Sequence, residues 1–157
     1  MHWHEQDPVN CSVGRTLEVV GKPWVLLILR EIFRGLHRFH DIQQHLAVSP
    51  PVLSRRLDSL VHDGLIDRAA YRVPGQRERY EYRLTQQGRA LLPVFAALHE
   101  WGDTYRADDC GAATVYRHRD CGAEVRLHLE CAHGHRLTTG DDVVAEPGIG
   151  AITLATK

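Results

Sequence analysis

The chain has 157 residues, of which 43% are hydrophobic and 25% are charged, and its formal net charge is −1. This length allows one core domain with a small appendage but not two full-sized domains, and no apolar run approaches the roughly 18 residues that cross a bilayer. The first residues lack the basic-then-apolar order of a secretory signal, so we expect a cytoplasmic protein whose four cysteines are reduced.

The small net charge conceals an uneven distribution of charge along the chain. Residues 34–89 contain ten arginines and six acidic residues, whereas residues 107–157 contain five Lys or Arg and eight acidic residues. Positive charge gathered in one segment is the electrostatic footprint expected of a surface that binds nucleic acid. The middle of the chain could form one such footprint.

Three helices are expected in the first third of the chain. Ser12 is a suitable N-cap for the first helix, in which Val13, Leu17 and Val20 recur at helical spacing. The sequence GKP then separates it from a second helix at about residues 24–33, which is apolar nearly all round and should form the buried centre of the domain. The stretch GLHRFHDIQQHLAV predicts a short third helix with one apolar side.

A fourth helix is predicted within SPPVLSRRLDSLVHDG, residues 49–64. At about 100° per residue, Leu53, Leu57 and Leu60 share one face, which should pack inward. Arg55 then points outward near the N-terminal end of the helix, where free amide groups and the helix dipole also attract phosphate. The alternative is that Arg55 belongs to an ordinary solvated face of a surface helix.

Two runs with β character follow, at residues 66–73 and 80–84, joined by a Pro-Gly turn with Arg77 and Arg79 near its tip. Helices followed by a hairpin with arginines at its tip give the order of a winged helix-turn-helix. In that arrangement the recognition helix enters the major groove, and the wing contacts phosphate or the minor groove. We therefore predict a mainly α fold with a small β wing.

A long helix at about residues 86–105, capped by Thr85 and bent at Pro93, should close the domain. It carries an apolar stripe wider than a domain of this size can cover, which predicts pairing with a second subunit. The alternative is that the stripe packs against its own domain. The residues predicted to form the dimer contact are Leu91, Val94, Phe95, Leu98 and Trp101.

Several motifs, taken together, resemble the HxlR-type winged helix-turn-helix transcriptional regulators of bacteria, which are related to the MarR group. They are Cys11, TLEVVGKPW, ILREI, RFHDI, SPPVLSRRLDSLVHDGLIDR, YEYRLTQQGRALLPV and HEWG, which span residues 11–102 in order. The resemblance implies a homodimer that binds double-stranded DNA at a short inverted-repeat operator and regulates nearby genes, with repression the expected outcome. It implies a winged-helix domain at residues 11–106 and leaves residues 107–157 as a C-terminal appendage.

The resemblance also assigns roles to individual residues. It places Pro51, Ser54 and Arg55 in the groove, where Arg55 can reach a guanine edge in a contact that provides about 1–3 kcal/mol of discrimination between bases. Arg56 would hold a phosphate or a neighbouring acid. The full predicted set of DNA contacts is Ser49, Pro51, Ser54, Arg55, Arg56, Arg38, Arg77 and Arg79.

Cys11 occupies a position at which several members of that family sense oxidants or electrophiles, so the resemblance permits a redox-sensing role. The helix N-terminus that follows could stabilise a thiolate, but the flanking sequence VNCSV supplies no base or cation. The alternative is a small packing residue.

The appendage differs in composition from the helices before it. Short β-like runs at residues 123–129 and 143–145 alternate with glycine and polar turns. An H-x-x-C motif followed by C-x-x-x-H resembles a degenerate zinc ribbon, in which two turns each give two ligands to one structural zinc ion. The alternative is a metal-free small sheet with solvent-facing histidines. The predicted ligands are His118, Cys121, Cys131 and His135, with His133 as a rival to His135.

Other function classes have weaker support in the sequence. No H-x-E with P-C-x-x-C, no glycine-rich phosphate loop and no nucleophile-elbow serine occurs, so the sequence predicts that the chain is not an enzyme. Two alternatives stay open: a winged-helix protein-interaction module without DNA, and a redox or electrophile sensor that acts through Cys11 on the same operator. A regulator of this kind could also respond to a small-molecule effector.

Overall fold

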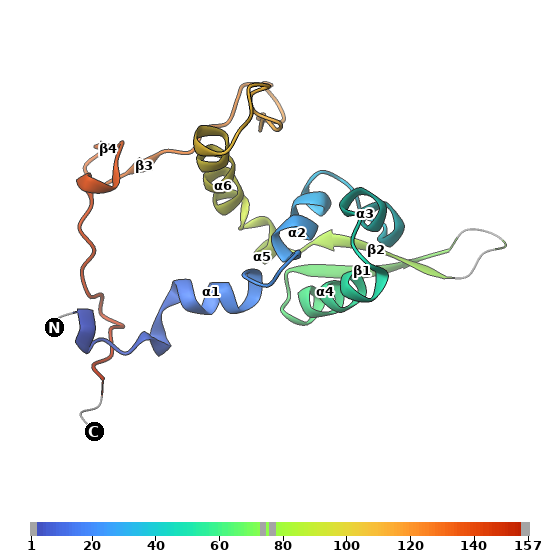
Figure 1. Ribbon diagram of the computed structural model, residues 1–157, viewed down its shortest axis with the longest axis horizontal. Coiled ribbons are helices and arrows are strands. Elements are labelled where there is room, and N and C mark those ends of the chain that lie inside the picture. Colours follow the sequence, from blue (N-terminus) through green and yellow to red (C-terminus); the bar gives the residue numbers. More distant parts are fainter. Residues whose placement is uncertain (1–2, 73–74, 76–77, 155–157) are drawn as a thin grey trace. The chain divides into compact units, whose positions relative to one another are not determined.

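The computed structural model describes residues 3–72, 75 and 78–154, and the chain divides into two compact units. The first unit comprises residues 1–90 and 150–157, and the second comprises residues 91–149. The elements of the first unit are α1 (Ser12–Val20), α2 (Val25–Phe33), α3 (Phe39–Leu46), α4 (Pro50–His62), β1 (Ile66–Tyr71), β2 (Arg79–Leu84) and α5 (Gln86–Arg89) (Figure 1). The elements of the second unit are α6 (Leu92–Tyr105), β3 (Leu129–Glu130) and β4 (Arg136–Leu137).

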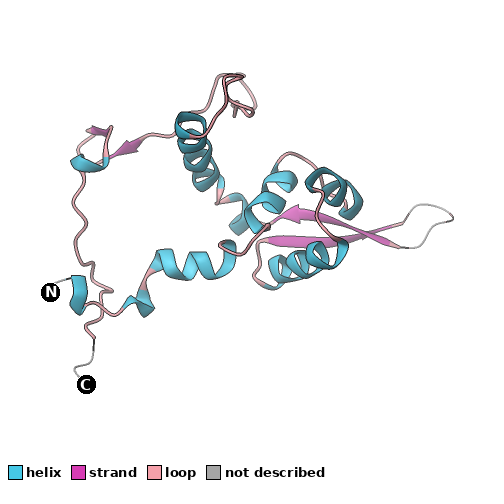
Figure 2. Ribbon diagram, in the orientation of Figure 1, coloured by secondary structure: helices cyan, strands magenta, loops and turns pink. Residues whose placement is uncertain are grey.

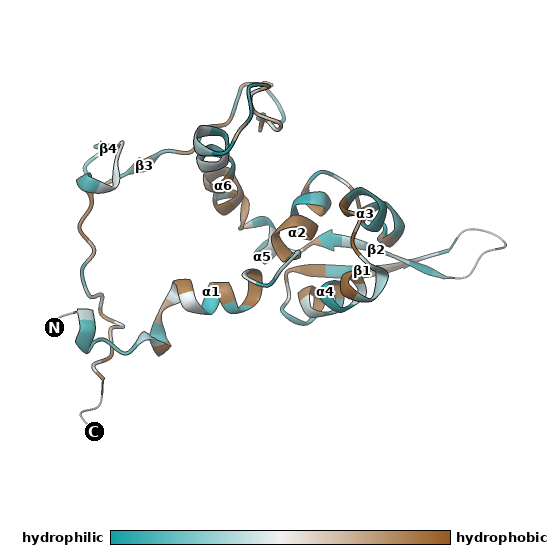
Figure 3. Ribbon diagram, viewed as in Figure 1, coloured by the Kyte–Doolittle hydropathy of each residue, from teal (hydrophilic) through white to brown (hydrophobic). Residues whose placement is uncertain are grey.

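Helices α2 and α4 contribute more buried apolar side chains to the first unit than any other described element. Figure 3 shows the strongly apolar character of α2. The predicted inner face of α4 is confirmed, because Leu53, Leu57 and Leu60 are at most 1% exposed. Burying each such side chain contributes about 1.5–3 kcal/mol to folding. The expectation that α2 is buried nearly all round is wrong on one side, where Leu27 is 39% exposed.

Strands β1 and β2 form the predicted antiparallel hairpin (Figure 2). Ile66 lies opposite Leu84 at the base, and Tyr71 lies opposite Arg79 at the far end. The residues at the base are buried against the helices, whereas Tyr80 near the far end is 39% exposed. The hairpin therefore has an anchored base and an outer end that faces solvent, as a wing requires.

The single long helix expected at residues 86–105 is in fact two helices. Helix α5 ends at Arg89, and α6 begins at Leu92 with Pro93 in its first turn. Proline lacks the amide hydrogen of a helix interior and clashes with the carbonyl four residues earlier, so the chain ends one helix and starts another where only a bend was predicted. The predicted cap at Thr85 is confirmed, because its side chain accepts a hydrogen bond from the Gly88 amide at 3.1 Å. No helix in the described part of the chain is long and apolar enough to cross a membrane.

The C-terminal segment of the second unit contains less strand than predicted. Strands β3 and β4 pair with Leu129 opposite Leu137, and one isolated bridge joins Arg117 and Glu124. The expected strand at residues 143–145 is absent, and the run at 123–129 contributes only the bridge and the start of β3. None of residues 107–149 is buried, so no apolar face holds longer strands together.

Candidate nucleic-acid interface

Helix α4 begins at a serine followed by two prolines. Ser49 is the N-cap in an extended conformation, and Pro50 and Pro51 occupy the first turn, where the amide hydrogen that proline lacks is not needed. No side-chain hydrogen bond caps this end of the helix. The hydroxyl of Ser49 and the amide of Val52 are therefore available to an anion such as phosphate, because the two prolines have no amide hydrogen and the Leu53 amide donates to the Ser49 carbonyl.

The outer face of α4 presents the residues predicted to meet DNA. Pro51, Ser54 and Arg55 are all exposed, on the side opposite the buried Leu53 and Leu57. Within the described part of the chain, no side chain or carbonyl forms a hydrogen bond or ion pair with the guanidinium of Arg55. This guanidinium keeps its full hydrogen-bonding capacity for an external partner.

Arg56 is in a different situation from its neighbour. It is half-buried, and its Nε donates a hydrogen bond to the backbone carbonyl of Pro23 at a distance of 3.1 Å. Pro23 lies just before α2, so this bond ties α4 to the segment that leads into α2. The described partner of Arg56 is thus a backbone carbonyl, where a phosphate or an acid was predicted.

Arg38 lies at the base of the wing, bound to Glu81. The Arg38 Nε is 3.2 Å from Glu81 Oε1, the Arg83 Nη2 is 3.2 Å from Glu81 Oε2, and the Arg38 guanidinium lies 4.9 Å from the centre of the Tyr71 ring. Hydrogen bonds from Arg83 and Arg38 lower the pKa of Glu81, and the bond to Glu81 raises the pKa of Arg38. The Arg38 side chain is still 54% exposed, so its orientation is fixed while one edge stays open to solvent.

The structure brings Arg38 and Arg79 to the same hollow, between the start of α3 and the wing. The hollow has a volume of about 500 Å³ and is lined by Arg38, Phe39, His40, Asp41, Tyr71, Arg79, Tyr80 and Tyr82. Arg79 is exposed at the first position of β2. Arg77, also predicted to contact DNA, lies outside the described residues. Two arginines on one concave surface suit a backbone phosphate.

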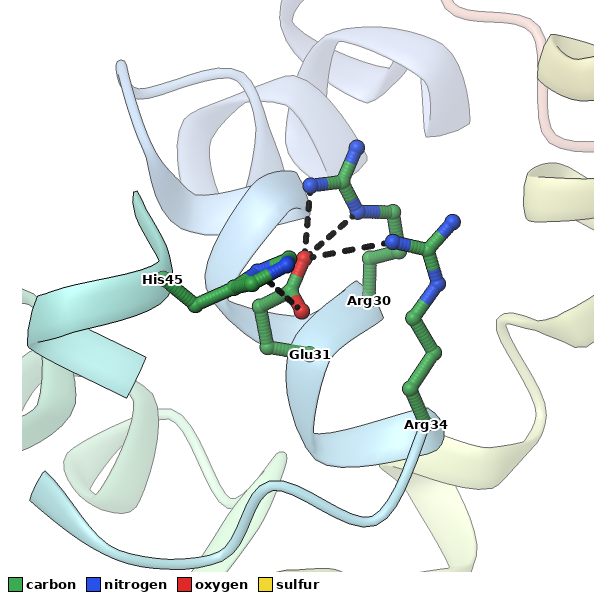
Figure 4. A network of polar contacts seen from close by, with 4 residues as sticks. All are labelled: Arg30, Glu31, Arg34 and His45. Atoms are coloured by element: carbon green, nitrogen blue, oxygen red, sulfur yellow. Dashed lines mark hydrogen bonds and ion pairs between the residues drawn. The ribbon is translucent and has the colours of Figure 1, made fainter. Parts of the chain in front are cut away.

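A buried carboxylate links α2 to α3. The side chain of Glu31 in α2 is fully buried, and its Oε1 is 2.6 Å from Nη2 of Arg30 and 3.5 Å from Nη1 of Arg34. Its Oε2 is 2.9 Å from Nδ1 of His45 in α3 (Figure 4). Apart from this ion pair, Oε2 has no hydrogen-bond partner in the described part of the molecule.

Glu31 is a structural determinant of the interface that the sequence reasoning missed. Helix α2 was interpreted as an apolar cylinder, and the one acid within ILREI was not considered separately. The sequence did contain a signal for it, because Arg30 and Arg34 lie beside Glu31 on the same helix. An acid on a buried helix needs such cationic partners to offset the cost of desolvation. The third partner, His45, is fourteen positions away and could be found only from the fold.

Comparison with known proteins identifies the family. The HxlR-like helix-turn-helix family matches residues 19–109. The chain belongs to that family. It is 44% identical over 139 residues to the HTH-type transcriptional regulator Rv3095 of Mycobacterium tuberculosis, a match that covers 88% of this chain and 87% of the relative. It is also 31% identical over 106 residues to the HTH-type transcriptional regulator YdeP of Bacillus subtilis, over 66% of this chain and 80% of that protein.

Solved structures give the same result. The crystal structure of PA1607, a candidate transcription factor, superposes with a TM-score of 0.74 and 33% identity, over 89% of this chain and 96% of that one. The redox regulator HypR in its reduced form matches 60% of this chain and 92% of its own, with a TM-score of 0.54 and 29% identity. The chain is thus a transcriptional regulator with a winged helix-turn-helix DNA-binding domain, and it is not an enzyme.

In this HxlR-like chain, α6 carries a largely uncovered apolar face. Val94, Leu98 and Trp101 are 39%, 49% and 54% exposed. Leu91 is half-buried, and Phe95 is only 4% exposed, so Phe95 packs within its own chain. Of the five residues predicted for the dimer contact, Phe95 is thus the one already covered in a single chain.

Cys11, and not Ser12 as predicted, is the N-cap of α1. Its backbone is extended, and its Sγ accepts a hydrogen bond from the Gly14 amide at 3.5 Å. Ser12 is instead the first helical residue. Cys11 is half-buried, so the thiol sits at a helix N-terminus with partial access to solvent.

The predicted metal ligands lie in two pairs. Sγ of Cys121 is 3.4 Å from Nδ1 of His118, and Sγ of Cys131 is 3.5 Å from Nδ1 of His135. The backbone amides of His133 and His135 lower the pKa of Cys131. Among the residues that the structure describes, no three His, Cys, Asp or Glu side chains form one group that could hold a metal ion. The structure therefore brings the members of each pair together but does not join the pairs.

Proposed function

We propose that the chain binds an inverted-repeat DNA operator as a homodimer, with α4 reading base edges and the wing contacting phosphate. The observation that carries this proposal is the state of Arg55, which is exposed on the outer face of α4 and has no described partner. An arginine whose guanidinium forms no hydrogen bond within its own chain can form a bidentate contact with guanine.

The other arginines support a division of labour within the interface. Arg79 and Arg38 share a hollow beside the wing, and the first turn of α4 offers the Val52 amide and the Ser49 hydroxyl. These groups suit phosphate oxygens, whose contacts set the register of the protein on the duplex without reading sequence. Arg56 would act indirectly, by holding α4 against the segment before α2.

A dimer is supported by the exposed apolar face of α6. Val94, Leu98 and Trp101 are large apolar side chains on one helix, and a monomer that left them in water would carry an aggregation-prone patch. Helix α1 adds Val13 and Leu17, which are 68% and 56% exposed. A two-fold dimer would present two copies of α4 to successive major grooves, about 34 Å apart on one face of the duplex.

Repression is the outcome that this interface can produce by itself. A dimer bound across successive grooves of a promoter excludes polymerase by occupying its site, and this requires no further contact with the transcription machinery. A reporter gene behind the selected operator should be expressed less in the presence of the protein. Increased expression would identify an activator instead.

The DNA-reading proposal can be tested with DNA selected by the protein from random sequence, followed by binding measurements at several salt concentrations. Arg55→Ala should relax preference at one position of each half-site, because the loss of one bidentate contact removes about 1–3 kcal/mol of discrimination. Arg79→Ala should weaken binding to all sequences alike and reduce the salt slope by about one phosphate.

Arg126→Ala is the matched control, because it removes the same charge from an exposed arginine outside the helix-turn-helix. It should leave the affinity, the preference and the salt slope unchanged. Unaltered affinity and base preference in Arg55→Ala would show that α4 is not the reader. Arg55→Glu also separates this function from a protein-interaction module, whose binding it should spare.

Redox sensing through Cys11 is a second candidate function. Two observations favour it: the thiol that caps α1 is only half-buried and so is accessible to an oxidant, and the fold is similar to that of the redox regulator HypR. Operator binding should then change after mild oxidation and be restored by a thiol reductant. Cys11→Ser should abolish that response, whereas Cys110→Ser should preserve it. An oxidation response that persists in Cys11→Ser would exclude this sensor.

A further inference from the structure

The segment after α6 contains two small hairpins, each closed by a pair of backbone hydrogen bonds. In the first, the His118 amide donates to the Ala123 carbonyl at 2.8 Å and the Gly122 amide donates to the His118 carbonyl at 2.9 Å. In the second, the Cys131 amide donates to the His135 carbonyl at 3.0 Å and the Gly134 amide donates to the Cys131 carbonyl at 2.9 Å. Both glycines have positive φ, 69° and 82°, which lets each turn close tightly.

Each hairpin tip brings one thiol and one imidazole together at a specific distance. The sulfur-to-nitrogen distances are 3.4 Å for Cys121 and His118 and 3.5 Å for Cys131 and His135. In a tetrahedral zinc site, with Zn–S of about 2.3 Å and Zn–N of about 2.0–2.1 Å, a sulfur and a nitrogen ligand lie about 3.5 Å apart. Both pairs thus already have the spacing of two ligands on one zinc ion.

The segment that carries the hairpins has no buried apolar core. No residue between 107 and 149 is buried, and large apolar side chains such as Leu129 and Val144 are 61% and 82% exposed. An isolated two-stranded hairpin is at best marginally stable in water. Small segments that cannot build an apolar core are commonly ordered by a structural metal ion, whose binding energy becomes folding energy.

We propose that one zinc ion joins the two hairpins, with His118, Cys121, Cys131 and His135 as its four ligands. Two thiolates and two imidazoles form a closed tetrahedral set with no open position for water or substrate, so the ion orders the segment and performs no chemistry. Nine residues separate Cys121 from Cys131. This length suffices for one strand out, a turn and one strand back, so the second hairpin can fold toward the first.

The fourth ligand is assigned to His135 on geometric grounds. The Nδ1 of His135 faces the sulfur of Cys131 at 3.5 Å, whereas the described contact of His133 with that sulfur is through its backbone amide and not its imidazole. The Cys131 amide donates to the His135 carbonyl across the base of this turn, and the side chains of these two residues also meet there. His133→Ala is therefore a control variant in the same turn.

The test is elemental analysis of the full chain, produced without a polyhistidine tag and in medium with added zinc. About one zinc per chain is expected, falling below about a tenth in Cys121→Ser and in Cys131→Ser, because each removes one of four ligands. Cys110→Ser should keep its zinc, because Cys110 is an exposed cysteine outside both hairpins. Metal-free wild type, or equal loss of zinc in Cys110→Ser, would overturn the site.

Two further measurements distinguish this ligand set from a bound metal of another kind. Cobalt in place of zinc should give the intense visible absorption of a tetrahedral thiolate complex, whereas a weak octahedral spectrum would contradict the proposal. His135→Ala should weaken zinc affinity by at least about tenfold and His133→Ala should not, so the reverse result would refute the assigned fourth ligand. Neither the cobalt spectrum nor the zinc affinity depends on DNA binding, so these measurements test the zinc site independently of the operator proposal.

Discussion

Replacing His45 by alanine should destabilise the helix-turn-helix more than its exposed position suggests. The His45 side chain is 55% exposed, but its Nδ1 is 2.9 Å from Oε2 of Glu31, whose side chain is completely buried. No other described group satisfies that oxygen. His45→Ala therefore leaves a buried carboxylate oxygen unpaired, although little apolar surface is lost.

The magnitude follows from the two opposing contributions. Leaving a buried acceptor without a partner costs about 1–3 kcal/mol. Alanine in place of histidine on a helix returns roughly half a kcal/mol through helix propensity. The net loss should be about 0.5–2.5 kcal/mol, which lowers the Tm of a domain of this size by roughly 2–20 °C.

Arg34→Ala should cost less, although it removes a formal charge from the same network. Oε1 of Glu31 is 3.5 Å from Arg34 but keeps Arg30, whose Nε and Nη2 lie 2.8 Å and 2.6 Å away. His40→Ala replaces another histidine of α3, at an exposed position, by alanine. It therefore controls for the change in helix propensity. Urea denaturation at neutral pH measures all three variants. The reasoning fails if Arg34→Ala costs as much as His45→Ala, or if His40→Ala does.

Two further predictions concern assembly and pH. Leu98→Glu should convert the proposed dimer to a monomer in analytical ultracentrifugation, because a charge cannot be buried without a partner in an apolar contact, and Leu129→Glu outside α6 should not. Dimeric Leu98→Glu protein at micromolar concentration would contradict the α6 interface. Because Arg83 and Arg38 lower the pKa of Glu81, its contribution to stability is present above the ordinary glutamate pKa and is lost as the pH falls through the lowered value. Glu81→Gln should flatten stability-versus-pH curves in that acidic window, and an unchanged curve would argue against the ion pairs.

Local patterns in the sequence were enough to predict the elements that carry the interface. The spacing of Leu53, Leu57 and Leu60 identified the buried face of α4, and with it the outward direction of Arg55. The alternation near Tyr82 identified β2. These features could be predicted because each depends on side chains within one or two turns of the same element, where helical and strand periodicity act directly.

What the sequence could not supply were contacts between distant parts of the chain. The Arg38–Glu81 bond spans 43 positions, and the bond from Arg56 to the Pro23 carbonyl spans 33. Neither partner is suggested by local spacing, so two adjacent arginines, Arg55 and Arg56, looked equivalent in the sequence. The break before Pro93 was missed for a different reason: proline permits either a bend or a new helix start, and tertiary packing selects between them.

Arg55 is left without a described intramolecular partner because the wing binds the nearest acid on the same helix. Asp58 lies three positions after Arg55 on the same helix, a spacing at which opposite charges commonly pair. Its Oδ1 is instead 3.5 Å from Nη1 of Arg68 in β1. This exposed pair adds little to stability, but it turns the carboxylate of Asp58 toward the hairpin and away from Arg55. If α4 and the wing contact DNA as proposed, the surplus of arginines in residues 34–89 supports recognition in two ways, because some of them meet DNA and others occupy the acids that would compete for those that do.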